Sequence, residues 1–175
     1  MPVAPEYLYL LALGSNRRHP LIGGPERVIA HAFDALEMSD ISLFDRSSIL
    51  RSLPLGPSLR RYANAAAIIV TTLSPPQLLY RIKSLEHHFG RRDSGQKWRA
   101  RVLDIDIILW SGGIWSSDHP ALIIPHPEMQ SRRFVLQPSA EIAANWRDPI
   151  GGLQIKHHFQ RINRAKRVDR RAAAN

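Results

Sequence analysis

The sequence predicts an α+β fold in which helices cover one face of an antiparallel sheet. Apolar runs of strand length and amphipathic helical patterns follow each other in the order strand, helix, strand, strand, helix, strand. That order is ferredoxin-like, and further patterns after it predict C-terminal additions. With 175 residues, 44% of them hydrophobic, the chain is long enough to bury one sizeable core.

The first strand and helix are indicated by an apolar run and a proline. Residues 7–13 form a continuous apolar run that stops at Gly-Ser-Asn, which predicts a buried central strand. Pro25 suits the first position of a helix. The apolar stripe of that helix has helical spacing and consists of Val28, Ile29, Ala32, Phe33 and Leu36.

A hairpin and a second helix come next. Residues 41–50 and 62–72 are rich in Ile, Val, Thr and Ala, and we expect them to pair as two strands around a turn at residues 54–57. Ser74 and Gln77 form a capping-box pattern at the start of the second helix. Its apolar stripe is Leu78, Leu79, Ile82, Leu85 and Phe89, and Gly90 ends it.

The next predicted strand carries two carboxylates. Asp104 and Asp106 alternate with the aliphatic residues Leu103, Ile105 and Ile107. A strand would place both carboxylates on one face, roughly 6 to 7 Å apart, where they could converge on magnesium. The upstream cations could bind a polyphosphate; they are Lys97, Arg99 and Arg101. The carboxylates could also be only the polar face of an edge strand.

The C-terminal part predicts a turn at residues 111–113, an extended stretch at 122–124 and a helix at about 129–136. We expect one domain over residues 1–160. Residues 161–175 contain six Lys or Arg and one Asp, and we expect them to form a basic, disordered tail.

Composition excludes several classes of protein. The chain has no cysteine, so disulfides, thiolate zinc sites and cysteine nucleophiles are ruled out. It lacks an apolar run of about 18 residues and the features of a signal peptide, and we expect a cytoplasmic protein without a membrane partner. The net charge of +9 predicts an anionic partner, either nucleic acid or a phosphorylated small molecule.

Five motifs follow one another along the chain: LGSN (13–16), LPLGP (53–57), YANAA (62–66), RVLDID (101–106) and IPHPEMQSRRF (124–134). In this order and spacing they resemble the 6-hydroxymethyl-7,8-dihydropterin pyrophosphokinase family. The resemblance implies a ferredoxin-like fold and transfer of diphosphate from ATP to the pterin alcohol in folate biosynthesis. It also implies ATP as co-substrate, two Mg²⁺ ions, a monomer, and no nucleic-acid partner.

The resemblance also implies roles for individual residues. The catalytic group would be Arg91, Arg101, Asp104 and Asp106, with the two aspartates as magnesium ligands and the arginines stabilising charge on the phosphoryl group. The pterin site would be Ser52, Pro54, Leu55, Tyr62, Asn64, Trp98 and Phe134. The ATP site would be Glu86, Arg91, Lys97, Arg101, Ile107, His126 and Arg132.

The residue types of the pterin site suit a flat, amide-bearing bicycle. Tyr62 and Phe134 could stack on its two faces, and Asn64 offers both a donor and an acceptor to its edge. Each aromatic side chain could instead be ordinary core, and Glu86 could face solvent. A buried asparagine between apolar residues is harder to explain as core, because an unpaired amide is costly.

Some positions depart from the family pattern. Asp93 stands where a second loop arginine is common, and Arg99 stands in place of a glycine. Ala121 and Ile123 occupy positions that often offer Arg and Thr to ATP. Two alternatives therefore stay open: a catalytically impaired relative, and a basic ferredoxin-like RNA-binding module. The aromatic-rich strand motif expected of the RNA-binding module is missing.

Overall fold

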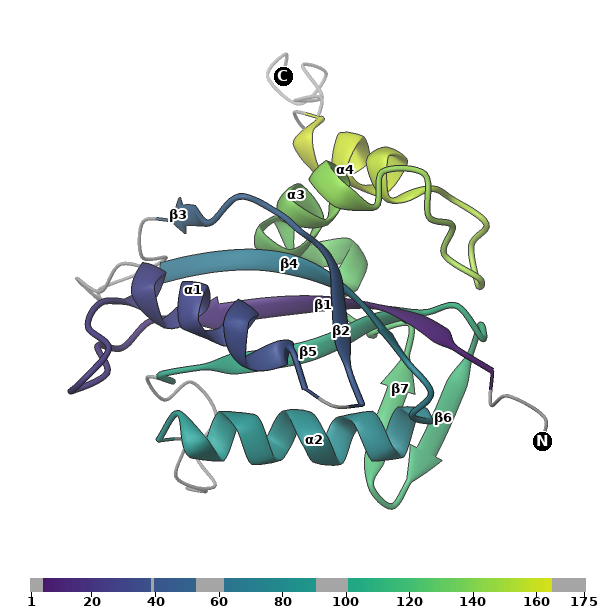
Figure 1. Ribbon diagram of the computed structural model, residues 1–175. Helices are drawn as coiled ribbons and strands as arrows, with labels where there is room; N and C mark the ends of the chain where they lie inside the picture. Colours follow the sequence, from purple (N-terminus) through teal and green to yellow (C-terminus); the bar gives the residue numbers. More distant parts are fainter. Residues whose placement is uncertain (1–4, 39, 53–61, 91–100, 165–175) are drawn as a thin grey trace, which may run out of the picture.

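The computed structural model describes residues 5–38, 40–52, 62–90 and 101–164 (Figure 1). The elements are β1 (Tyr7–Ser15), α1 (Pro25–Leu36), β2 (Ser42–Arg46), β3 (Leu50–Ser52), β4 (Tyr62–Thr71), α2 (Pro75–His88), β5 (Asp104–Trp110), β6 (Trp115–Asp118), β7 (Ala121–Ile124), the 3₁₀ helix η1 (Met129–Ser131), α3 (Arg133–Ile142) and α4 (Ile155–Asn163). The predicted ferredoxin-like order of an antiparallel sheet and helices is confirmed.

β1 lies at the centre of the main sheet. It pairs antiparallel with β4 on one side and with β5 on the other, and β2 and β3 both pair with β4. β6 and β7 form a separate hairpin after the main sheet. Among the described residues, the strand order is therefore β2-β4-β1-β5, with β3 beside β4.

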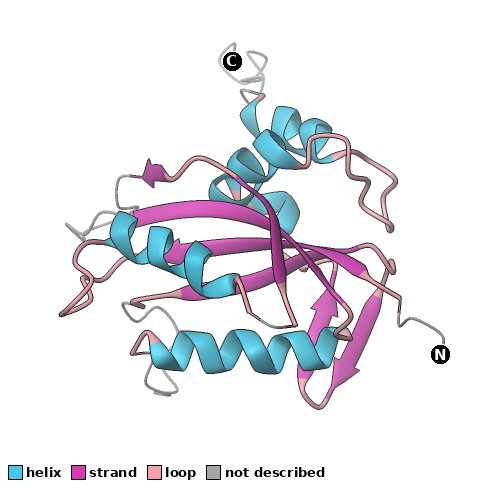
Figure 2. Cartoon of the chain, in the orientation of Figure 1, coloured by secondary structure: helices cyan, strands magenta, loops and turns pink. Residues whose placement is uncertain are grey.

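Helices cover both faces of the sheet, as Figures 1 and 2 show. On one face, Leu11 and Leu13 of β1 pack with the apolar stripes of α1 and α2. On the other face, Leu10 and Ala12 pack with residues of α3 and α4. Because alternate side chains of β1 enter two different cores, the strand is apolar throughout. The C-terminal helices α3 and α4 cover the second face of the sheet, whereas the prediction placed helices on one face only.

The prediction of one strand over residues 41–50 was wrong. The pairing of β2 with β4 shifts register between Leu43 and Asp45. The Ser47 hydroxyl then accepts a hydrogen bond from the backbone N–H of Ala66 at 2.9 Å. A side-chain oxygen thus takes the place of a backbone acceptor, so the segment splits into β2 and β3.

The two long helices begin as predicted. Pro25 is the first residue of α1, and the Gln77 side chain accepts a hydrogen bond from the Ser74 backbone N–H at the start of α2. Gly90 follows α2 with a φ of 85°, a conformation that favours glycine.

The C-terminal helices differ from the prediction. An extended residue, Arg132, separates η1 from α3, and α3 continues through Pro138 to Ile142, so the predicted helix at 129–136 had the wrong bounds. α4 was not predicted, although its apolar side chains Ile155, Phe159 and Ile162 have helical spacing. α4 ends at Asn163, beyond the expected domain boundary at residue 160. In the described part of the chain, no helix is both long and apolar enough to cross a membrane.

Candidate active site

The register of the sheet brings two predicted sites together at one glycine. Gly14 pairs with Asn64 of β4 on one side and with Asp104 of β5 on the other. A side-chain Cβ at Gly14 would lie 3.6 Å from the Asn64 Oδ1 atom. Asn64 and Asp104 share a sheet face because residues paired across neighbouring strands point the same way. The predicted pterin-edge residue and the predicted magnesium ligand therefore lie on one sheet face, on either side of Gly14.

Asp104 and Asp106 lie on the same face of β5, and each is partly exposed. The Arg101 guanidinium donates to the Asp104 Oδ1 atom at 2.5 Å. Ile105 and Ile107 point into the opposite core. The predicted alternation of carboxylates and aliphatic side chains is thus confirmed.

Asn16, from the LGSN motif, holds the backbone of Arg101. The Arg101 N–H donates to the Asn16 side-chain oxygen at 2.7 Å, and the Asn16 N–H donates to the Arg101 carbonyl at 3.1 Å. This two-way contact fixes the chain just before the carboxylate strand. This role of Asn16 was not predicted, although the LGSN motif that contains it is visible in the sequence.

Glu86 is fully buried, so the solvent-facing alternative was wrong. Its Oε1 atom accepts the Ile105 N–H at 2.7 Å, and its Oε2 atom accepts from the Lys83 ammonium at 2.9 Å. Ile105 lies between the two aspartates in the sequence. The Glu86 carboxylate therefore fixes the backbone of β5 at the point from which both carboxylates extend.

His126 approaches Asp106 from the segment after β7. Its backbone N–H donates to the Ile108 carbonyl at 3.0 Å, which attaches the segment to β5. The imidazole Nδ1 atom accepts the Glu128 N–H at 3.1 Å, and the Nε2 atom lies 3.9 Å from the Asp106 carboxylate. Burial is the main cause that lowers the pKa of His126, which favours a neutral ring with its proton on Nε2.

Arg132 lies beside the same carboxylate. Its guanidinium is 3.4 Å from the Asp106 Oδ2 atom, and it also pairs with Glu128. It also lies over the ring of Phe134, 5.9 Å from the ring centre. Cations from two different segments, Arg101 and Arg132, thus flank the two aspartates, where phosphate oxygens could replace the carboxylates as their partners.

The other pterin residues are placed in part. Asn64 is buried, Tyr62 is half-buried at the start of β4, and Phe134 is 41% exposed at the start of α3. Such exposure of a large ring is unusual for core and suits a stacking surface. Ser52 pairs with Tyr62 through the β3–β4 ladder.

Several predicted site residues are not described on the sheet face that carries Asp104 and Asp106. The Ile107 side chain is buried in the core beneath α1 and α2, away from the carboxylates. Five predicted site residues lie outside the described residues: Pro54, Leu55, Arg91, Lys97 and Trp98. Asp93 and Arg99, the two departures in the loop, lie there as well.

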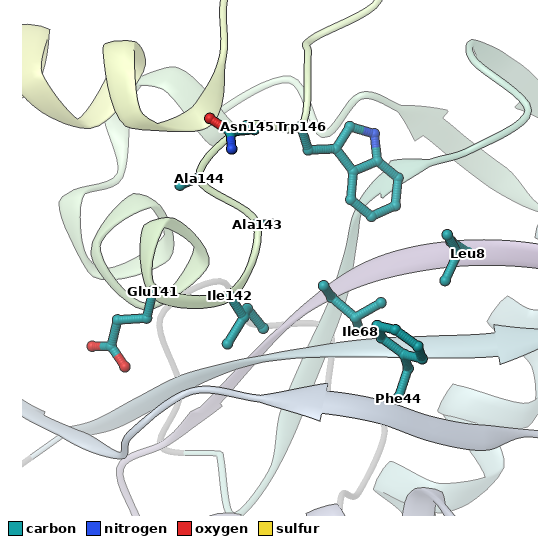
Figure 3. Close-up of a pocket in the computed structure, with 9 residues that line it drawn as sticks. All are labelled: Leu8, Phe44, Ile68, Glu141, Ile142, Ala143, Ala144, Asn145 and Trp146. Carbon is teal, nitrogen blue, oxygen red and sulfur yellow. The ribbon is translucent and has the colours of Figure 1, made fainter.

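A cavity of about 340 Å³ lies elsewhere, between the sheet and the end of α3 (Figure 3). Leu8, Phe44, Ile68 and Trp146 contribute apolar side chains to it. None of the described predicted site residues lines it. Leu8 and Ile68 lie toward the end of the β1–β4 ladder opposite Gly14, so this cavity is distinct from the candidate site.

The donor set fits magnesium bound together with phosphates. Within the described ranges, no three His, Asp or Glu side chains cluster closely enough to hold a metal. Magnesium, however, usually keeps several waters and takes only one or two protein carboxylates plus phosphate oxygens. Asp104 and Asp106 match that smaller requirement.

Comparison with known proteins decides the family. Residues 10–144 match the model of the 7,8-dihydro-6-hydroxymethylpterin-pyrophosphokinase (HPPK) family. The chain belongs to this family. It is 39% identical over 144 residues to a Pseudomonas aeruginosa protein and 38% identical over 136 residues to a Haemophilus influenzae protein, each named 2-amino-4-hydroxy-6-hydroxymethyldihydropteridine pyrophosphokinase.

Coverage differs among the HPPK relatives. The two matches cover 81% and 77% of this chain, and 83% and 81% of the Pseudomonas and Haemophilus proteins. A Synechocystis relative of the same name is 40% identical, but the match spans 67% of this chain and only 58% of that protein. These matches give no support to the RNA-binding alternative.

Among solved structures, the HPPK-DHPS protein of Plasmodium falciparum with pteroate superposes with a TM-score of 0.70. The match covers 90% of this chain and 44% of that one at 11% identity. At that identity the likeness supports the fold alone, and it agrees with the antiparallel sheet and helices described above.

Proposed function

We propose that this protein transfers diphosphate from ATP to the hydroxymethyl group of 6-hydroxymethyl-7,8-dihydropterin, forming AMP and the pterin diphosphate for folate biosynthesis. One observation carries the proposal in a chain of the HPPK family: Gly14 lies between Asn64 and Asp104. The residue suited to an amide edge and the residue suited to a metal are thus separated by a single strand position without a side chain.

The pterin would bind on the Asn64 side. The amide of Asn64 can donate to and accept from the edge of the bicycle, and burial strengthens such hydrogen bonds. Tyr62 and Phe134 would contact its faces. The missing side chain at Gly14 leaves space for the hydroxymethyl group to point toward Asp104.

ATP would bind on the Asp106 side. Arg101 and Arg132 would exchange their carboxylate partners for phosphate oxygens, and the neutral His126 would donate its Nε2 proton to another. The pterin hydroxymethyl oxygen would attack the β-phosphorus in line and lose its proton to solvent water. The bond from that phosphorus to the oxygen shared with the α-phosphate would break, and that oxygen would leave with AMP.

Asp104 and Asp106 would hold the two Mg²⁺ ions that this proposal includes. When bound, such ions neutralise phosphate charge and lower the pKa of a coordinated hydroxyl. The protein residues do the positioning: Glu86 and Asn16 fix the backbone on either side of Asp104. We also propose that the protein is a monomer and acts in the cytoplasm.

Formation of AMP tests the function. The purified protein would be incubated with ATP, magnesium and the pterin alcohol, and AMP and pterin diphosphate would be separated by chromatography. We expect equal amounts of both products. Asp106→Ala should lower the rate at least about 100-fold, because a ligand for the magnesium that neutralises the transferring phosphates is removed. Asp118→Ala, on the exposed end of β6, should not lower it.

A wild-type protein that yields no AMP under these conditions would refute the activity and support the catalytically impaired alternative. Normal AMP formation by Asp106→Ala would refute the metal assignment alone.

A further inference from the structure

The segment from His126 to Arg132 is attached to the rest of the molecule at both ends. At its start, the His126 backbone donates to β5, and near its end Arg132 lies beside Asp106. In the middle, Met129 is buried in the same core as Ile155 of α4. The segment therefore bridges the carboxylate strand and the C-terminal helix.

One side chain of this segment points away from the candidate site to a buried carboxylate. The Gln130 Nε2 atom donates to the Asp148 Oδ2 atom at 3.1 Å. Gln130 is itself exposed, whereas Asp148 is 1% exposed. A buried aspartate is costly unless donors surround it, so this hydrogen bond matters to both partners.

Asp148 is rigidly held by its own loop. Its Oδ1 atom accepts the Ile150 N–H at 2.8 Å, its backbone N–H donates to the Leu153 carbonyl, and its carbonyl accepts the Gly152 N–H. These contacts close a tight turn between α3 and α4. The carboxylate is therefore a fixed point for the flexible side chain of Gln130.

His158 of α4 closes the remaining side of the carboxylate. It is 4% exposed, its Nε2 atom lies 3.5 Å from the Asp148 Oδ2 atom, and that nitrogen has no hydrogen-bond partner. Burial is the main cause that lowers the pKa of His158 and keeps the ring neutral. At 3.5 Å the neutral ring can give the carboxylate only a weak hydrogen bond, so the amide of Gln130, at 3.1 Å, is the closer side-chain donor.

We propose that Asp148, acting through Gln130, is a positioning residue that holds the His126–Arg132 segment against Asp106. The inference rests on the proposed function, because that segment supplies two residues expected to contact ATP. Neither Gln130 nor Asp148 touches the substrate in this scheme. A buried carboxylate in the C-terminal addition would thus influence phosphate binding on the carboxylate strand.

The first test compares Gln130→Ala with Gln160→Ala, a matched exposed glutamine on α4. Gln130→Ala should lower kcat/KM for ATP about 10-fold, since small displacements of positioning groups cost 10- to 100-fold in rate. Pterin affinity, measured by titration calorimetry, should match that of Gln160→Ala, whereas the midpoint of thermal unfolding should be lower than in Gln160→Ala because buried Asp148 loses a donor. A uniform loss of ATP and pterin binding would overturn the proposal.

Hydrogen exchange provides a measurement that does not depend on activity. In Gln130→Ala, backbone amides of residues 126–132 should exchange faster, while those of β4 stay as slow as in the wild type. If the wild type forms no AMP but exchange accelerates in this way, the proposed function fails and the positioning role stands. Unchanged exchange together with unchanged kcat/KM would overturn the positioning role alone.

Reciprocal variants separate this hydrogen bond from general stability. Gln130→Glu places two carboxylates together and should lower kcat/KM for ATP more than Gln130→Ala does. Asp148→Asn leaves two amides that can still pair, with a smaller loss. The double variant restores an amide-to-carboxylate hydrogen bond with its polarity reversed, and should recover most of the rate lost in Gln130→Glu. Failure of the double variant to recover activity despite normal unfolding would overturn the proposal.

Discussion

The two halves of the candidate active site are built in different ways. On the sheet, Asn64, Gly14 and Asp104 are aligned by backbone pairing of three adjacent strands. On the other side, His126 and Arg132 belong to a segment held mainly by individual hydrogen bonds and by Met129. Backbone ladders resist single side-chain changes, whereas isolated contacts do not. The pterin side should therefore be rigid and the phosphate side adjustable.

The largest expected effect comes from filling the gap in the rigid half. Gly14→Leu would place a branched side chain between Asn64 and Asp104, and pterin affinity should fall about 100-fold because the Asn64 amide would lose its partners. Gly14→Ala is the graded comparison: its Cβ would meet only ordinary protein contacts at 3.6 and 4.0 Å, but it takes part of the space proposed for the hydroxymethyl group, so affinity should fall less than in Gly14→Leu. Titration calorimetry with the pterin measures both.

The outcome for Gly14 tests where the pterin binds. If Gly14→Leu unfolds cooperatively at the wild-type temperature and still binds the pterin normally, the pterin does not lie beside Gly14. Loss of affinity in Gly14→Ala as severe as in Gly14→Leu would also contradict the geometry, because a methyl group fills much less of the space beside Gly14.

A smaller effect is expected in the adjustable half. Arg132→Ala should raise KM for ATP about 10-fold, because Arg132 lies beside Asp106, with a much smaller change in pterin affinity through its contact with the Phe134 ring. Arg133→Ala, the exposed neighbour at the start of α3, is the matched control. Steady-state kinetics with varied ATP measure the difference. Equal effects of the two substitutions would mean that only net charge matters.

A third effect concerns the junction of the halves at Arg101. Asn16→Ala removes the acceptor for the Arg101 N–H and should lower kcat about 5-fold, in line with the roughly 1 kcal/mol of one hydrogen bond. Asn16→Asp keeps an acceptor oxygen and should retain most activity. If the aspartate variant loses as much rate as the alanine variant, the Asn16 side chain does not act by holding the Arg101 backbone.

The rigid half was also the more predictable half. The alternation at Asp104 and Asp106 and the apolar run of β1 carry period-2 patterns that a sequence shows directly. Gly14 and Asn16 stood in a motif, but their partners could be identified only from strand register. Register depends on pairing across the sheet, which no local pattern specifies.

The adjustable half depends on contacts between distant segments, and prediction failed more often there. A contact of the same kind explains the one failure on the sheet, where the Ser47 hydroxyl and the Ala66 backbone split β2 from β3. The link from Gln130 to Asp148 spans 18 residues and involves a carboxylate that resembles any surface aspartate in the sequence. α4 had a readable apolar spacing, yet it adjoins a basic stretch that favoured disorder.

The smallest expected effect is a pH dependence of stability in the adjustable half. The pKa of buried His158 is lowered below its usual value of about 6.5, with Asp148 opposing the shift and Arg161 and His157 adding to it. Below about pH 6.5 the unfolded chain therefore binds more protons at this site than the folded one. As the pH is lowered, the free energy of unfolding decreases until the pH drops below the pKa of His158 in the folded protein.

The substitution His158→Gln should make the free energy of unfolding less dependent on pH between about pH 7.5 and pH 5, because it removes this proton uptake. Urea titrations across that range measure the slope, and His157→Gln, on the same helix but less buried, is the control. The pKa of His126 is also lowered, so part of the pH dependence of the free energy of unfolding should persist in both variants. An unchanged slope in His158→Gln would contradict a lowered pKa of this imidazole, and a slope that rises would show that the folded protein binds this proton more tightly than the unfolded chain does.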